Sequence, residues 1–217
     1  MSLVVVKVGG AAAADASGRV LALAEHHDVC VVHGAGPQIT AEMARRGLPL
    51  AFVRGRRVTT PEALDVVLES LAEVSAALCA ALGARAVPVP AGSLDAVAVS
   101  ELGLVGEAVP CAPAAVRAAL AQGLIPVVPP VAAGPLNVNA DEAAVALALG
   151  LGADRLVFVT DVPGVLVEGA VAASLAAAEA ERLADTFDGG IVPKLLAAVR
   201  AARGGVEAEI GGTAVTA

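Results

Sequence analysis

The sequence predicts an α/β fold in which a mostly parallel β-sheet is covered by helices on both faces. Apolar, strand-like runs alternate with helix-like stretches along the whole chain. Two of these runs, 3–8 and 30–33, lead directly into glycine loops that precede helices, which is typical of parallel βαβ units. The strands are apolar throughout rather than alternating, as expected for a sheet that is buried on both faces.

The other elements follow from capping residues, glycines and apolar spacing. Thr60 and Pro61 favour the start of a long helix, because threonine caps helices and proline suits the first helical position. The composition shifts after about residue 150, which indicates one domain with a first lobe, 1–150, and a shorter second lobe, 151–217. We expect helices at about 14–26, 38–46, 60–82, 113–122, 141–151, 174–184 and 192–203, strands at 3–8, 30–33, 124–128 and 155–160, a strand or hairpin at 52–58, short strands across 86–109, and a last strand at 205–210.

Composition narrows the class of function. The chain of 217 residues is 57% hydrophobic, carries a net charge of −8 and has almost no aromatic residues. Without aromatic platforms or a basic surface, we expect no nucleic-acid partner. Three widely spaced cysteines lack a metal-ligand pattern and are typical of buried thiols in a reducing compartment. No convincing signal peptide and no uninterrupted apolar run of about 20 residues occurs, so we expect a cytoplasmic protein without a membrane span.

Asn137, Asn139 and Asp141 form a polar cluster between a buried strand and an apolar helix. In parallel sheets this position lies at the carboxyl end of a strand, where ligands bind. Helix capping by Asn139 or Asp141 accounts for one of the three polar groups and leaves two unexplained. The cluster therefore indicates a functional site.

Lysine usage points to the same chemistry. The chain has 12 arginines but only two lysines, Lys7 and Lys194, and both stand beside paired glycines. Lysine is a compact point charge that suits a phosphate, whereas arginine forms a planar fork. Neither glycine loop matches a dinucleotide or P-loop fingerprint, which argues against dehydrogenases and P-loop enzymes.

Other polar residues leave alternatives open. His33 ends a strand, where a structural histidine is more common than a catalytic base. Arg54, Arg56 and Arg57 precede the long helix, and they form either a solvated edge or a guanidinium fork for a carboxylate substrate.

Taken in order, these segments resemble the amino acid kinase family, and within it the acetylglutamate kinases. The resemblance covers nearly the whole chain, and the segment 137–141 matches outright. The segments that carry it are Lys7-Val8-Gly9-Gly10, His33-Gly34-Ala35-Gly36-Pro37-Gln38, Gly55-Arg56-Arg57-Val58-Thr59, Val105-Gly106-Glu107, Asn137-Val138-Asn139-Ala140-Asp141, Thr160-Asp161-Val162-Pro163-Gly164-Val165 and Gly190-Ile191-Val192-Pro193-Lys194.

The resemblance implies an open, mostly parallel sheet of about eight strands between helices, the carbamate kinase-like fold. It also implies an ATP-dependent kinase that phosphorylates the side-chain carboxylate of N-acetylglutamate in arginine biosynthesis. The first lobe would bind the amino-acid substrate and the second the nucleotide. Mg²⁺ would arrive with ATP rather than at a metal site of the protein, and a homodimer is expected.

The resemblance also implies residue roles. Lys7 and Lys194 would neutralise the phosphoryl oxygens, and Asp141 would orient both lysines rather than act as a base, because a carboxylate acceptor is already deprotonated near pH 7. The implied substrate-binding residues are Gly9, Gly10, Gly34, Ala35, Gly36, Arg57, Asn137 and Asn139. The implied nucleotide-binding residues are Asp161, Val162, Pro163, Gly164, Val165, Leu166, Thr186, Phe187, Asp188 and Lys194.

Some features depart from the family pattern. Ala35 replaces a glycine and adds a methyl group where the substrate should approach. The expected lid hairpin at about 91–103 and the loop before Gly211 are shortened. No extra helix precedes Leu3, so we do not expect the arginine-inhibited hexamer of some relatives.

Competing hypotheses remain. A kinase for aminoadipate or glutamate linked to an acidic carrier protein is disfavoured by the net charge of −8 and by the 137–141 sequence. A non-catalytic binding homologue is disfavoured because Lys7, Asp141 and Lys194 are all present. A phosphate, phosphonate or carbamate acceptor is disfavoured by Arg57 and the two asparagines.

Overall fold

The computed structural model describes residues 1–9, 13–160 and 162–217. Within these residues, eight strands form the main sheet in the order β14-β16-β15-β11-β1-β2-β8-β5, and neighbouring strands are parallel except β15 and β16. This confirms the predicted fold class. The strands of this sheet are β1 (Leu3–Val8), β2 (Asp28–His33), β5 (Ala86–Pro88), β8 (Ile125–Val128), β11 (Arg155–Val159), β14 (Ser174–Ala176), β15 (Glu207–Ile210) and β16 (Thr213–Thr216).

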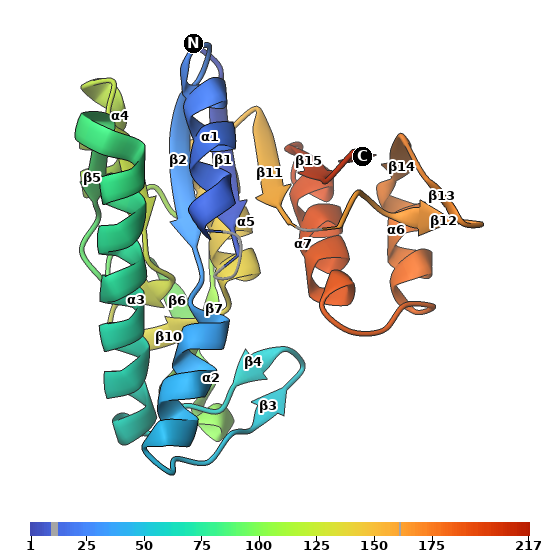
Figure 1. The fold of residues 1–217 in the computed structure, drawn as a ribbon. Coiled ribbons are helices and arrows are strands. Elements are labelled where there is room, and N and C mark those ends of the chain that lie inside the picture. The colour runs from blue at the N-terminus through green and yellow to red at the C-terminus, as the bar shows by residue number, and fades with distance from the viewer. Residues whose placement is uncertain (10–12, 161) are drawn as a thin grey trace.

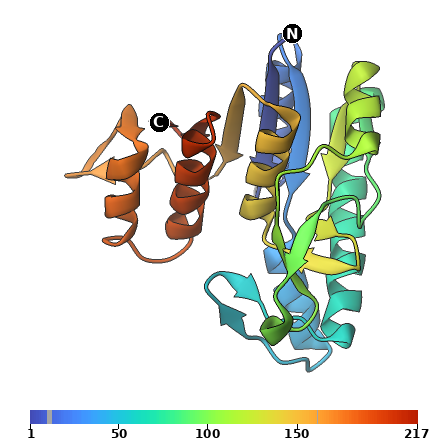
Figure 2. The same cartoon turned by 180° about the vertical axis from the view of Figure 1, so that it is seen from behind.

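Helices cover both faces of the sheet (Figures 1 and 2). On one face lie α1 (Ala13–Ala24), α2 (Gly36–Arg45) and α3 (Pro61–Leu82). On the other lie α4 (Ala114–Ala121), α5 (Ala140–Leu151), α6 (Ala177–Ala184) and α7 (Ile191–Arg203). Alternation along β1 separates the two cores, since Val4, Val6 and Val8 face α1 and α3 while Val5 faces α5. Lys7 shares the side of Val5 and therefore points toward α5.

Smaller sheets lie beside the main one. One is the hairpin of β3 (Phe52–Val53) and β4 (Arg56–Arg57), and another pairs β12 (Leu166–Val167) with β13 (Ala170–Val171). The third has four strands in the order β6 (Ala96–Ala98), β7 (Val105–Ala108), β10 (Leu136–Val138) and β9 (Val131–Ala132). The β3–β4 hairpin extends below the carboxyl edge of the main sheet, next to α2 (Figure 1). The hairpin expected at 52–58 is thus present.

The helix α3 begins as predicted, because the Thr60 side chain accepts a hydrogen bond from the Ala63 N–H and Pro61 follows it. Among the described residues, Pro61–Arg85 is the one helical segment long and apolar enough to cross a membrane. Its Val67, Leu71 and Leu78 side chains are buried in the core that α3 forms with the sheet. We therefore identify α3 as a core helix.

Two predictions near the C-terminus were wrong. The helix expected at 174–184 begins only at Ala177, because Ser174–Ala176 pairs with β16 as an edge strand. The strand ending at Ile210 is not the last, since the chain turns at Gly211, where φ is +57°, and returns as antiparallel β16. The β15–β16 hairpin therefore lies beside the edge strand β14.

Candidate active site

The candidate site lies at the carboxyl ends of the central strands. Strand β1 pairs with β2 on one side and with β11 on the other. The chain builds the sheet outward from β1 first in one direction and later in the other, so the strand order reverses beside β1. Open α/β sheets bind ligands outside such a point. Here a cavity of 970 Å³ opens between the ends of these strands, the starts of α2, α5 and α7, and the β3–β4 hairpin.

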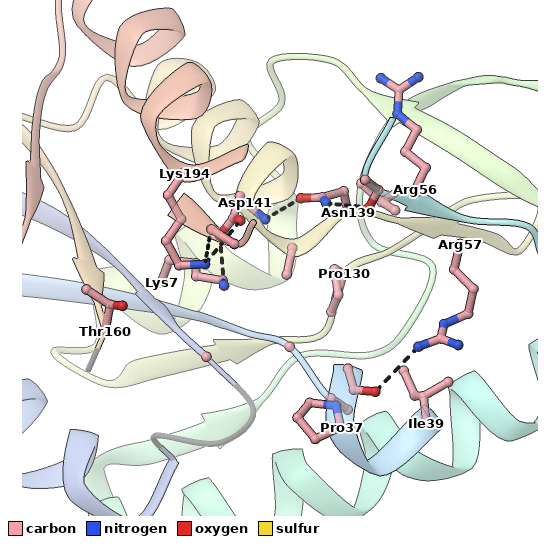
Figure 3. Close-up of a pocket in the computed structure, with 18 of the residues that line it drawn as sticks. Lys7, Pro37, Ile39, Arg56, Arg57, Pro130, Asn139, Asp141, Thr160 and Lys194 are labelled. Atoms are coloured by element: carbon pink, nitrogen blue, oxygen red, sulfur yellow. Dashed lines mark hydrogen bonds and ion pairs between the residues drawn. The ribbon is translucent and has the colours of Figure 1, made fainter. Parts of the chain in front are cut away.

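At the centre of this cavity Asp141 lies between the two lysines (Figure 3). Its Oδ1 is 2.7 Å from Lys7 Nζ and its Oδ2 is 3.7 Å from Lys194 Nζ. The Lys7 and Asp141 side chains are only 7% and 9% exposed, so this ion pair is shielded from solvent. Asp141 stands in the first turn of α5, where the helix dipole favours a negative charge. The lysines come from β1 and α7, and one carboxylate joins them.

Arg57 is a further cation on the cavity wall, and it is buried. Its guanidinium donates to Thr40 Oγ1 at 2.8 Å and lies 4.6 Å from the centre of the Phe52 ring. Burial lowers the pKa of Arg57. Among the ion pairs of the described residues, Arg57 has no acidic partner. A buried guanidinium without a carboxylate favours an anionic ligand.

The two asparagines line the cavity but are engaged with the protein. Asn139 caps α5, because its Oδ1 accepts from the N–H groups of Asp141 and Glu142. Its Nδ2 donates to the Gly55 carbonyl at 3.2 Å, while Asn137 Nδ2 donates to Thr59 Oγ1 at 3.0 Å. Capping, the simpler interpretation of this cluster, therefore holds for Asn139.

The glycine loops border the cavity through Gly9, Gly34 and Gly36, while Gly10 lies outside the described residues. The Gly34 N–H donates to the Val8 carbonyl at 3.1 Å, so this amide already has a partner. Added Cβ atoms at Gly9 and Gly36 would meet nothing within 4 Å, which shows open space beside both backbones. Ala35 has φ −138° and is 2% exposed within the α2–α3 core, so its methyl group causes no backbone strain.

The predicted nucleotide residues divide into two groups. Val162 and Asp188 line the same cavity as Lys194, whereas Asp161 lies outside the described residues. The others lie beyond its lining. Pro163 O accepts from the Gly212 N–H at 2.7 Å, and the Val165 N–H donates to Thr213 Oγ1 at 2.8 Å. Gly164 packs against Val171 and Thr213, Leu166 and Thr186 are exposed, and Phe187 borders an adjoining hollow of 710 Å³ that shares Gly55, Asn139 and Asp188 with the cavity.

His33 has a structural role rather than a catalytic one, which is the interpretation that the sequence favoured. Its Nε2 lies 2.7 Å from Ser75 Oγ on α3, and the ring is 1% exposed. Burial lowers the pKa of His33 to about 4, so the ring is neutral near pH 7. His33 is absent from the cavity lining.

Sequence reasoning missed Phe52 and Glu142. Phe52 stacks on Arg57 across the hairpin, and Glu142 on α5 forms an ion pair with Arg56. Both contacts join residues that are distant in sequence or on opposite hairpin strands, and only the rarity of aromatic residues hinted at Phe52.

Comparison with known proteins identifies the family. A sequence model of the amino acid kinase family matches residues 2–212. Acetylglutamate kinase of Rubrobacter xylanophilus is 40% identical over 228 residues, covering 97% of this chain and 88% of the relative. Acetylglutamate kinase of Frankia casuarinae is 39% identical over 201 residues, and the match covers 82% of this chain and 56% of that longer relative. The chain therefore spans little more than half the length of some curated relatives it matches.

Solved structures share the fold. The smu.665 protein of Streptococcus mutans superposes with a TM-score of 0.90 at 26% identity, covering 99% of this chain and 98% of that one. Carbamate kinase of Giardia lamblia, bound to AMP-PNP, has a TM-score of 0.74 at 15% identity, with 99% and 98% covered, which supports the fold alone. The family match over residues 2–212 and the relative that is 40% identical over 97% of the chain show that the chain belongs to the amino acid kinase family.

Proposed function

We propose that this protein phosphorylates the side-chain carboxylate of N-acetylglutamate with ATP and so makes the acyl phosphate of arginine biosynthesis. The observation that carries the proposal is the pairing of Asp141 with Lys7 and Lys194 at the carboxyl edge of the sheet. Relatives about 40% identical over most of the chain carry the name acetylglutamate kinase, which supports the same acceptor.

The reaction needs two anions to meet. A carboxylate oxygen of the acceptor attacks the γ-phosphorus of ATP, the bond to the bridging oxygen breaks, and ADP leaves. Lys7 and Lys194 would stabilise the charge on the transferring oxygens, in a site where positioning and electrostatics supply most of the catalysis. Asp141 would hold both ammonium groups in place, and it needs no proton from the acceptor.

We assign acceptor binding to the side of the cavity that is lined by the first lobe, residues 1–150. The buried Arg57 guanidinium would bind the α-carboxylate, with Gly9 and Gly36 offering backbone N–H groups at the phosphoryl end. Gly10, Gly34 and Ala35 belong to the same two loops. Asn137 and Asn139 would contact the amide part of the substrate only by exchanging or sharing their present partners.

Nucleotide binding is assigned to the shorter second lobe, 151–217, and acceptor binding to residues 1–150. Val162, Asp188 and Lys194 are the members of the predicted nucleotide set that reach the cavity. Mg²⁺ would enter with ATP, since this ion is normally held by substrate phosphates and waters with few protein ligands. We also propose that the protein is cytoplasmic and forms a homodimer. Light scattering of the purified protein tests the dimer.

A coupled assay of ADP release tests the function. N-acetylglutamate, N-acetylaminoadipate and a carrier-protein conjugate of glutamate are compared, and hydroxylamine traps any acyl phosphate as a hydroxamate. We expect ADP and hydroxamate in equal amounts with N-acetylglutamate. Turnover with the carrier conjugate alone would overturn the proposed acceptor, and ATP binding by calorimetry without turnover on any acceptor would overturn catalysis.

A further inference from the structure

Arg56 and Arg57 are neighbours on β4, but their side chains leave the hairpin in opposite directions (Figure 3). Arg57 contacts α2 through Thr40 and lies over the ring of Phe52 on β3. Arg56 lies toward α5 and the β6–β7 sheet. The proposed function uses Arg57 and leaves Arg56 unexplained.

Arg56 makes a forked contact that joins three elements. Its Nε donates to Glu142 Oε1 at 2.9 Å and its Nη2 to Glu142 Oε2 at 3.2 Å. The same Nη2 lies 3.1 Å from Glu107 Oε2 on β7. The Arg56 and Glu142 side chains are 19% and 22% exposed, so the pair is partly shielded from solvent. Forked arginine–carboxylate pairs fix orientation as well as distance.

The turn of the β3–β4 hairpin is also attached to the start of α5. Its central residues, Arg54 and Gly55, have φ of 49° and 77°, which describes a tight two-residue turn. The Gly55 carbonyl accepts from Asn139, the cap of α5. The hairpin therefore has two attachments to the first turn of α5, one through its turn and one through Arg56.

These attachments connect the acceptor side of the cavity with its catalytic centre. Glu142 directly follows Asp141 on α5, and Arg57 directly follows Arg56 on β4. We propose that Arg56 is a positioning residue whose ion pair with Glu142 holds Arg57 at a fixed place relative to Asp141. This inference rests on the proposed function, in which Arg57 binds the acceptor.

Steady-state kinetics of R56L, R56K, E142Q and the double variant R56L/E142Q test the proposal. Arg57 would bind a non-reacting carboxylate, so loosening it weakens acceptor binding rather than chemistry. We expect the KM for N-acetylglutamate to rise about tenfold in R56L, with kcat and the KM for ATP changed less than about twofold. R56K should be intermediate, because an ammonium cannot form the fork. The double variant should be no worse than R56L, because both changes remove the same contact.

R203L is the matched control, because Arg203 forms a similar forked pair with Glu181 on helices α6 and α7, outside the cavity lining. It should leave the acceptor KM unchanged. A KM in R56L and R56K equal to that of the wild type, independent effects of R56L and E142Q, or a fall confined to kcat would overturn the positioning role.

A second measurement needs no catalysis, so it stays readable if the proposed function fails. The chain has no Trp or Tyr, and therefore F52W introduces a single fluorophore on the hairpin beside Arg57. We expect R56L and R56K to increase acrylamide quenching of that fluorophore relative to F52W alone, and R203L to leave quenching unchanged. Equal quenching with and without the Arg56 substitutions would show that the ion pair does not hold the hairpin.

Discussion

At the scale of single residues, the proposed chemistry depends on the carboxylate of Asp141 and the ammonium groups of Lys7 and Lys194. Lys7 ends up beside Asp141 because it occupies the α5-facing side of β1, and Lys194 because it lies in the first turns of α7. Lysine usage singled out the two lysines, and the family resemblance implied that Asp141 orients them. The sequence did not indicate that the Gly34 N–H is already bound to Val8, because a strand-to-strand contact leaves no local signature.

Lys194→Arg tests the requirement for a point charge. Lys194 Nζ lies 3.7 Å from Asp141 in a partly buried setting, and a wider planar guanidinium displaces either the carboxylate or the phosphoryl oxygens. We expect kcat to fall about 100-fold with the fold intact. Arg203→Lys, on the exposed end of the same helix, is the control. Turnover of the Lys194 variant near that of the wild type would remove the argument from lysine usage.

Lys7 and Asp141 should behave as a buried ion pair. Asp141→Asn leaves the Lys7 ammonium in a shielded site without its closest counter-ion, and we expect unfolding free energy to fall by about 3 kcal/mol. Adding Lys7→Met removes the stranded charge, so the double variant should recover most of that loss while staying inactive. Urea denaturation measures both. A double variant less stable than Asp141→Asn would contradict the assignment.

His33 gives the stability a pH dependence. Burial lowers its folded-state pKa from the usual 6.5 to about 4, so the unfolded chain binds this proton first as pH falls. The contribution is constant above pH 6.5 and declines between pH 6.5 and pH 4, by roughly 3 kcal/mol in total. We expect His33→Gln to flatten this part of the stability profile. Parallel profiles for the wild type and the His33 variant would contradict this account.

At the scale of elements, strong local signals predicted the structure well. The cap at Thr60 and the proline after it set the start of α3, and Asn139 caps α5 in the cluster that first drew attention. The segment 174–176 was misread because alanine-rich sequence favours a helix, while pairing with β16 holds it as a strand. The final hairpin had a signal in Gly211 and Gly212 that was read only as a shortened loop.

Thr60→Ala measures the contribution of that cap. It removes the acceptor for the Ala63 N–H, and we expect a loss of about 1 kcal/mol in the free energy of unfolding. Thr60→Ser keeps the hydroxyl and should retain most of the stability. Equal losses in the alanine and serine variants would show that the methyl group, rather than the hydrogen bond, matters.

At the scale of the whole molecule, the fold class followed from the alternation of apolar runs and helices, while the site depended on long-range geometry. The proposed catalytic lysines lie on strand β1 and helix α7, and the arginine proposed to bind the acceptor lies on the β3–β4 hairpin. The ties of the hairpin to α5 could not be predicted, because Arg56 and Glu142 are 86 residues apart. A local pattern cannot encode such a contact.

The most direct test of the central claim is a crystal structure with ADP, a mimic of the transferring phosphoryl group and N-acetylglutamate. We expect the mimic between the ammonium groups of Lys7 and Lys194, with the side-chain carboxylate of the acceptor facing it and the α-carboxylate on Arg57. An acceptor bound away from Arg57, or a mimic that contacts neither lysine, would contradict the assignment of this cavity as the site of phosphoryl transfer.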